Sequence, residues 1–439
     1  MKKIILGLLL FFSAFVFAQH TISGTFMPAK DYSWIIAYRL KPGTQVYVAD
    51  TAIKKGEFSL NIPENSPKGM YRLVYAVPQE EFYFDVVYNG EEDIKLQFTT
   101  ENGVSFLESK ENIIFNSYFN EVSAIEAKII EFYSSGSTIE KKYNTLIKKL
   151  KKTQTAFETS SEGLMANTFI KANRLHLPES YVDVFAFISE KKKNYFNGLD
   201  FTNTTLQASG FLTDKTLNYV FTALPLEQMT KEGTEKIMQN NVDKVNLETK
   251  NVDSNYRLHL FYTIWAQAAA SQFNATSDYV FITYLKKLAQ DLGKKDIVQE
   301  IQLHNRLRIG AVAPKISWKE GNNVQTLNTL EGSKNYVLVF WSSTCSHCIK
   351  ELPALHKELK KYPDITVIAV GMEEDTISWD VEKAKFPNFK HAIALGKWES
   401  DYAKLYAVNQ TPTYFILDSN KRFIAKPEDD KQVIEYLNK

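Results

Sequence analysis

The sequence predicts a chain of several domains: an N-terminal all-β domain, a central α-helical domain and a C-terminal α/β domain. Two observations lead to this fold class. The chain has 439 residues, which is more than a single hydrophobic core usually serves. The hydrophobic pattern also changes twice, from short strands to helical spacing and then to apolar strands separated by helices. We place the three domains at residues 19–108, 109–308 and 309–439.

The first 18 residues have the features of a secretory signal peptide. Lys2 and Lys3 form a short basic region, residues 4–17 are apolar, and Ala18 ends a stretch that suits cleavage. A membrane anchor is the rival interpretation, but residues 4–17 are shorter than the roughly 20 residues that a bilayer requires. We therefore expect export of the protein, and a periplasmic location in a bacterial source.

Charge argues against a nucleic-acid partner. The chain carries 52 Lys and Arg against 51 Asp and Glu, a formal net charge of +1. Proteins that bind nucleic acid through its phosphates usually show a strongly basic surface. We expect no nucleic-acid partner.

Residues 19–108 contain several short segments rich in β-branched and aromatic residues. Examples are residues 34–38, 71–75 and 82–88, and turn signals such as Lys41-Pro42-Gly43 and Asn89-Gly90 separate the segments. This pattern predicts a small all-β domain, in which we recognise no catalytic constellation.

Residues 109–308 follow helical spacing instead. Apolar residues recur three and four positions apart at Ile114, Tyr118, Val122, Ile125 and Ile129. The histidines of this region are far apart in sequence and lack the spacing of metal ligands, so we expect no metal site there.

Strands and helices alternate after residue 309. Residues 336–341 and 365–370 read as buried strands, and a helix is expected between them at about 345–361. Residues 413–418 and 422–425 flank a turn and predict a β-hairpin, and a last helix is expected at about 428–437. Such alternation is typical of layered α/β domains.

The chain has two cysteines, Cys345 and Cys348, and they form a CxxC motif at the start of the predicted helix. The unpaired N–H groups and the positive end of the dipole at a helix N-terminus stabilise a thiolate. A cysteine three residues further on lies on the same side of the helix, within reach of a disulfide after a small adjustment. The motif therefore predicts thiol–disulfide exchange, in which Cys345 attacks and Cys348 resolves.

Other uses of a cysteine pair fit less well. A zinc site requires two further ligands, and no second cysteine pair exists in the sequence. Covalent haem requires a histidine directly after the second cysteine, where this chain has Ile349. A structural disulfide at this spacing closes a very small loop and restricts little of the unfolded chain. We expect no metal and no organic cofactor, because the cysteine pair itself carries the electrons.

Four features occur together and in order in the last 130 or so residues: Gly310-Ala311-Val312-Ala313-Pro314, a strand ending Phe340-Trp341, the CxxC motif, and Thr411-Pro412-Thr413. In this the chain resembles the TlpA/ResA branch of exported thioredoxin-like proteins. The resemblance implies a thioredoxin fold, an exposed nucleophile at Cys345 and a resolving thiol at Cys348. It also implies a cis Thr411–Pro412 bond beside the motif, where substrate would dock against Thr411, Pro412 and Trp341.

Two further residues are candidates for tuning the centre. Glu351 matches a glutamate that the family associates with proton handling at the thiols, although a solvated helix glutamate is an equal alternative. His347 lies between the cysteines, where an imidazole would lower the thiol pKa and make the couple more oxidising. A histidine that points into solvent without effect is the other interpretation.

We therefore expect a protein-disulfide oxidoreductase that exchanges dithiol and disulfide with exported proteins, acting as a reductase. A membrane-bound thiol carrier would then recharge the cysteine pair. The alternative is a protein that binds a partner or ligand through its first two domains, with the thioredoxin-like domain as an accessory module.

Overall fold

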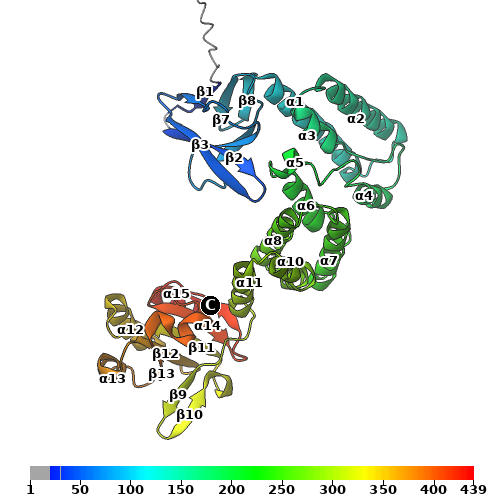
Figure 1. Ribbon diagram of the computed structural model, residues 1–439. Coiled ribbons are helices and arrows are strands. Elements are labelled where there is room, and N and C mark those ends of the chain that lie inside the picture. The colour runs from blue at the N-terminus through cyan, green and yellow to red at the C-terminus, as the bar shows by residue number, and fades with distance from the viewer. Residues whose placement is uncertain (1–19, 30) are drawn as a thin grey trace, which may run out of the picture. The chain divides into compact units, whose positions relative to one another are not determined.

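The computed structural model describes residues 20–29 and 31–439 (Figure 1). These residues divide into two compact units, and the division falls between Leu292 and Gly293. The expected signal peptide, residues 1–18, lies outside the described residues. Each unit is described below by itself.

The first unit begins with a sandwich of two four-stranded sheets. Both sheets contribute to one core, in which Phe26 lies 5.1 Å from Phe98 in its own sheet and 6.4 Å from Phe84 in the facing sheet, measured between ring centroids. In spatial order, one sheet is β4 (Glu57–Asn61), β1 (Thr21–Met27), β7 (Ile94–Thr99) and β8 (Gly103–Glu108), and the other is β3 (Thr44–Ala52), β2 (Trp34–Lys41), β5 (Gly69–Val74) and β6 (Tyr83–Tyr88).

A helical region follows in the same unit. Four of the five apolar residues that predicted the first helix are buried, and Ile114 is partly buried. None of the described helices is both long enough and apolar enough to cross a membrane. The helices are α1 (Lys110–Ser134), α2 (Glu140–Ser160), α3 (Ala166–Ala172), α4 (Val184–Lys193), α5 (Thr204–Gln207), α6 (Phe211–Thr222), α7 (Lys231–Glu248), α8 (Ser254–Ala270), α9 (Asn274–Val280), a π-helical segment (Phe281–Leu285) and α10 (Lys286–Asp291).

Buried polar side chains at the start of α1 join the sandwich to the helices. The Asn112 amide accepts a hydrogen bond from the Val87 N–H and donates one to the Val87 carbonyl, both at 2.8 Å. The Glu111 carboxylate accepts from the N–H groups of Met165 and Ala166, at the start of α3. Because an unpaired buried polar group is costly, these contacts fix where the first helix leaves the sheet.

The second unit is an α/β domain built on a five-stranded sheet in the order β13–β12–β11–β14–β15. The first three strands of that order are parallel, and β14 and β15 are antiparallel to their neighbours. The arrangement is that of a thioredoxin-like domain. Its elements are α11 (Lys295–Leu307), β9 (Ser317–Glu320), β10 (Asn323–Thr326), a 3₁₀ turn (Leu327–Thr329), β11 (Asn335–Trp341), α12 (Ser346–Leu359), β12 (Ile365–Glu373), α13 (Ile377–Lys383), β13 (Lys390–Leu395), a 3₁₀ turn (Lys397–Glu399), α14 (Asp401–Tyr406), β14 (Thr413–Asp418), β15 (Phe423–Ala425) and α15 (Asp430–Leu437).

Strand β11 runs through the middle of this sheet and is buried on both faces. Side chains alternate across a strand, so Leu338 and Phe340 enter one core while Val339 and Trp341 enter the other. The second core also contains Cys348. Because β11 is packed on both faces, it fixes the position at which the CxxC motif begins.

Helix α11 belongs to this second unit and not to the helices before it. Leu307 is buried in the core on one face of the sheet, and Leu303 packs against the same core. The compact unit thus starts at residue 293, upstream of the boundary at 309 that the change of pattern suggested. We propose 293–439 as the stretch that folds on its own.

Removing α11 should weaken the domain. We expect a fragment of residues 293–439 to unfold cooperatively, and a fragment of residues 309–439 to be less stable by about 2–4 kcal/mol because the leucine contacts of α11 are lost. Urea denaturation followed by circular dichroism measures the difference. Equal stabilities would show that α11 is not part of the folded domain.

Candidate dithiol site

The cysteine motif begins where β11 ends. Cys345 has extended backbone angles, φ −87° and ψ 118°, and occupies the position just before helix α12. Its carbonyl accepts the first hydrogen bond of the helix, from the Ile349 N–H at 3.0 Å, and its own N–H donates to the Ser342 carbonyl at 3.1 Å. The sulfur atom consequently lies at the helix N-terminus, where the backbone N–H groups have no partner within the helix.

The Cys345 thiol is partly exposed, and its pKa is lowered from the ordinary value. Partial burial alone would raise this pKa, but hydrogen bonds from the backbone N–H groups of Cys348 and His347 outweigh burial. Thr411 adds a side-chain hydrogen bond that favours the thiolate, and its carbonyl oxygen lies 3.4 Å from the sulfur. The helix start thus lowers the pKa of a thiol that remains partly exposed, which are the properties of a reactive cysteine.

Cys348 lies in the opposite environment. Its side chain is fully buried in the core beside Trp341, and both cysteines are free thiols. Burial, with a smaller contribution from the neighbouring Cys345, raises the pKa of the Cys348 thiol to about 12. The two sulfur atoms therefore differ in exposure and in acidity, as a nucleophile and a resolving thiol do.

The Thr411–Pro412 bond is cis, as the family resemblance implied. The two residues are half-buried and directly precede β14, which pairs with β11. This pairing brings a loop that is 66 residues from Cys345 in sequence against the cysteine sulfur. The structure thus assembles Thr411 and Pro412 with the CxxC motif.

Glu351 faces a tyrosine that sequence reasoning missed. The hydroxyl of Tyr414, a fully buried residue of β14, donates to the Glu351 carboxylate at 3.1 Å. Burial raises the pKa of Tyr414, and the charges of Glu351 and Cys348 raise it further, which places this hydroxyl close to both groups. The only signal in the sequence was a tyrosine inside an otherwise apolar strand, which periodicity cannot distinguish from a core residue.

Glu373 is a second residue that the sequence did not single out. It is a buried carboxylate at the end of β12, and it accepts hydrogen bonds from the Ser343 N–H at 2.6 Å and from the Ser342 hydroxyl at 3.4 Å. Its contacts hold the loop that precedes Cys345. An acidic residue at the carboxyl end of an apolar strand was the available signal, because that end of a parallel sheet carries the sites of α/β proteins.

The structure does not support direct substrate contact by Trp341. Its side chain is fully buried and meets the Phe386 ring edge-on, with 6.0 Å between centroids, because it points into the core that also holds Cys348. We correct its expected role from substrate binding to packing beneath the motif. The imidazole of His347, in contrast, is exposed, and this residue acts on Cys345 through its backbone N–H.

Comparison with known proteins identifies relatives of the second unit. Residues 309–425 match the model of the AhpC/TSA family. Over 140 residues the chain is 30% identical to the thiol-disulfide oxidoreductase ResA of Bacillus thuringiensis, covering 30% of this chain and 79% of that protein.

Two solved structures are also similar. A domain of a possible thiol-disulfide isomerase from Cytophaga hutchinsonii is 25% identical, with a TM-score of 0.27 and coverage of 30% of this chain and 92% of that one. A thioredoxin-like protein from Bacteroides caccae is 17% identical, with a TM-score of 0.36 and coverage of 60% and 98%.

The two thiols should differ sharply toward alkylation. We expect iodoacetamide at pH 7 to modify Cys345 and to leave Cys348 unmodified, because only the thiolate reacts and the Cys348 pKa is about 12. Mass spectrometry across a pH series should give a midpoint for Cys345 below the reference of about 8.5 for a free thiol. Equal labelling of both cysteines at pH 7 would contradict the assignment.

Proposed function

We propose that this chain, which belongs to the thiol-disulfide oxidoreductase family through its C-terminal thioredoxin-like domain, reduces disulfides of exported proteins at Cys345 and Cys348. The observation that carries the proposal is the contrast between the two thiols. Cys345 is partly exposed with a lowered pKa, and Cys348 is buried with a raised one. Two thiols that were both buried or both exposed would not be distinguished as one that attacks the substrate and one that resolves the mixed disulfide.

The reaction would proceed in two displacements. The Cys345 thiolate attacks one sulfur of the substrate disulfide, the substrate S–S bond breaks, and one substrate thiolate leaves. Cys348 then loses its proton and attacks the Cys345 sulfur, which releases the second substrate thiolate and forms the Cys345–Cys348 disulfide. Two electrons and two protons pass to the substrate, and the oxidised pair needs a thiol donor before the next turnover.

The second displacement needs a proton acceptor, because a thiol with a pKa of about 12 is almost wholly protonated at pH 7. We propose Glu351 for this role. It lies one helical turn from Cys348, and the Tyr414 hydroxyl holds its carboxylate. Tyr414 would act as a positioning residue for the carboxylate.

Substrate would dock against the loop of Thr411 and Pro412. Both residues are half-buried beside the exposed thiol, and the Thr411 carbonyl already faces the Cys345 sulfur. A substrate cysteine approaching Cys345 must pass this loop. His347, whose side chain is exposed, would tune the couple through its ring in addition to its backbone N–H.

The setting of the reaction is part of the proposal. The signal-like sequence of residues 1–18 supports export to the periplasm. There a membrane-bound thiol carrier would return electrons to the Cys345–Cys348 pair. No metal or organic cofactor is required for either displacement.

Blocking the second displacement should trap substrate. We expect Cys348→Ser, with native disulfide-bonded insulin as the test substrate, to accumulate mixed disulfides through Cys345, because the resolving thiol is gone. Mass spectrometry identifies the adducts. The matched variant Cys345→Ser should form none and should also abolish insulin reduction. Adducts through Cys348 in that variant would reverse the roles.

Glu351→Gln should slow turnover at neutral pH. General-base catalysis typically contributes a factor of about 10²–10⁴, so we expect a loss of at least tenfold in insulin reduction at pH 7 that narrows as the pH rises. The control is Glu358→Gln on the same helix, whose carboxylate pairs with Lys361 at the surface. An equal loss in both variants, or a loss that does not change with pH, would exclude a proton-accepting role for Glu351.

A further inference from the structure

The helical part of the first unit contains a polar cavity of about 180 Å³, far from the cysteine motif in sequence. Such a volume is smaller than the roughly 300–1,000 Å³ of pockets for drug-sized ligands, and it suits an ion or a single small molecule. Helices α1, α4 and α6 and the segment that follows α3 contribute most of the lining, which includes Ser123, Glu126, Arg174, Lys191, Asn194 and Lys215.

Three cations converge on this cavity, and two of them already have a carboxylate partner. Lys191 pairs with Glu126 at 2.7 Å, and Arg174 pairs with Glu158 at 2.6 Å. Among the described residues, no hydrogen bond or ion pair engages the ammonium of Lys215. The cavity therefore holds one positive charge more than its partnering carboxylates neutralise.

The ammonium of Lys215 is the group with which a bound anion would form an ion pair. Its ammonium lies 5.6 Å from the ring centroids of both Tyr195 and Phe211, within the range of cation–π contacts. Burial lowers the pKa of Lys215 to about 8, and the nearby Glu126 opposes this only in part. A partly desolvated cation that has aromatic rings but no carboxylate beside it is costly, and an anion in the cavity would offset that cost.

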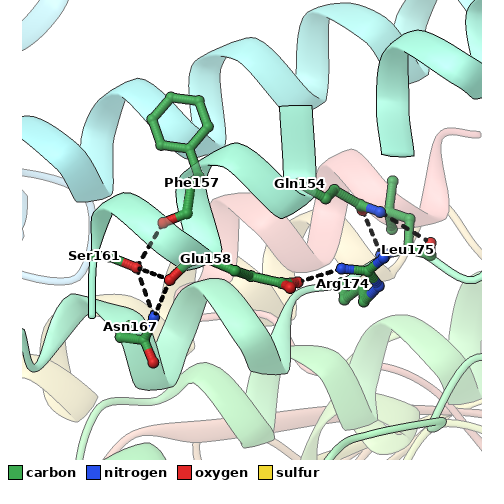
Figure 2. Close-up of polar contacts among 7 residues, drawn as sticks. All are labelled: Gln154, Phe157, Glu158, Ser161, Asn167, Arg174 and Leu175. Atoms are coloured by element: carbon green, nitrogen blue, oxygen red, sulfur yellow. Dashed lines mark hydrogen bonds and ion pairs between the residues drawn. The ribbon is translucent and has the colours of Figure 1, made fainter. Parts of the chain in front are cut away.

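Residues of helix α2 hold the part of the lining that contains Arg174 and Leu175 in place (Figure 2). The Gln154 amide accepts from the Leu175 N–H at 2.8 Å and donates to the Leu175 carbonyl at 3.4 Å. The Arg174 guanidinium donates one N–H to Glu158, whose backbone carbonyl accepts from the Asn167 amide at 2.8 Å. A guanidinium has five N–H donors, so Arg174 can contact a ligand while remaining paired.

A neutral donor completes the set. The amide oxygen of Asn194 accepts from Asn197 at 3.1 Å, so the remaining hydrogen-bonding atoms of Asn194 are its N–H donors. With Lys215, Arg174 and Lys191, the lining thus offers donors from three sides. Ligands with several acceptor oxygens match such a set, and cations or donor-rich ligands do not.

We propose that this cavity binds a small oxyanion, either free phosphate or a small carboxylate, with Lys215 as the principal contact and Arg174, Lys191 and Asn194 around it. Such binding is independent of the dithiol chemistry and gives the helical region a function of its own. It concerns residues that all lie within the first unit.

Isothermal titration of the full chain tests the proposal, with sodium phosphate and sodium malonate as separate probes at constant ionic strength set by sodium chloride. We expect saturable binding of one or both, which also distinguishes the two sources of the anion. Lys215→Met should weaken that binding at least tenfold, as expected for the loss of a charge-assisted hydrogen bond. Lys193→Met is the matched control, because it removes an equal charge from an exposed position on α4 outside the cavity.

A second pair of variants does not depend on replacing Lys215. Ser123 is exposed on α1 at the edge of the cavity, so Ser123→Glu should fold, place a carboxylate beside the cations and abolish anion binding, whereas Ser123→Gln should retain more of it. Circular dichroism confirms that each variant is folded. Absence of saturable binding in the wild type, or equal weakening in Lys215→Met and Lys193→Met, or in Ser123→Glu and Ser123→Gln, would overturn the proposal.

Discussion

The contact between the Cys345 sulfur and the start of helix α12 is the constraint on which the site depends. The backbone N–H groups of His347 and Cys348 can reach that sulfur because Cys345 is extended and the next residue is helical. This geometry is held from below by β11, which is buried on both faces, and from the side by Glu373, which binds the loop before the cysteine. A thiol elsewhere on the helix would lack this stabilisation.

The same geometry gives the two thiols different burial and different pKa values. One turn into the helix the chain has entered the core, so Cys348 is buried in the cluster that also contains Trp341, and this burial raises its pKa. Buried thiols of this kind are poor nucleophiles until a base acts on them. The Glu351–Tyr414 hydrogen bond supplies a carboxylate at the required face of the helix. The contrast in exposure and pKa therefore supports the proposed order, in which Cys345 attacks the substrate first and Cys348 then attacks the Cys345 sulfur.

The sequence was sufficient to predict those features that depend on residues close together in the chain. Strand and helix order, the CxxC motif at a helix start and Glu351 one turn later are all readable from neighbouring residues. Tyr414 and Glu373 were missed because their partners are distant in the chain, 63 residues from Glu351 in one case and 30 from Ser343 in the other. Trp341 was expected to contact substrate because of the family resemblance, and a strand buried on both faces shows no alternation of polar and apolar residues that would reveal the burial of this side chain. The oxyanion cavity was likewise invisible, because four separate segments build it.

The central claim is that Cys345 and Cys348 form one reversible two-electron couple, and that its reduction potential is low, so the reduced pair donates electrons to substrate disulfides. Equilibrating the full chain in redox buffers of known potential, and counting free thiols by mass spectrometry, tests this most directly. The account predicts a single transition, lost in Cys345→Ser, with a midpoint nearer to the about −270 mV of thioredoxin than to the about −120 mV of DsbA. A pair that stays reduced in the most oxidising buffer, or a midpoint close to the oxidising value, would contradict it.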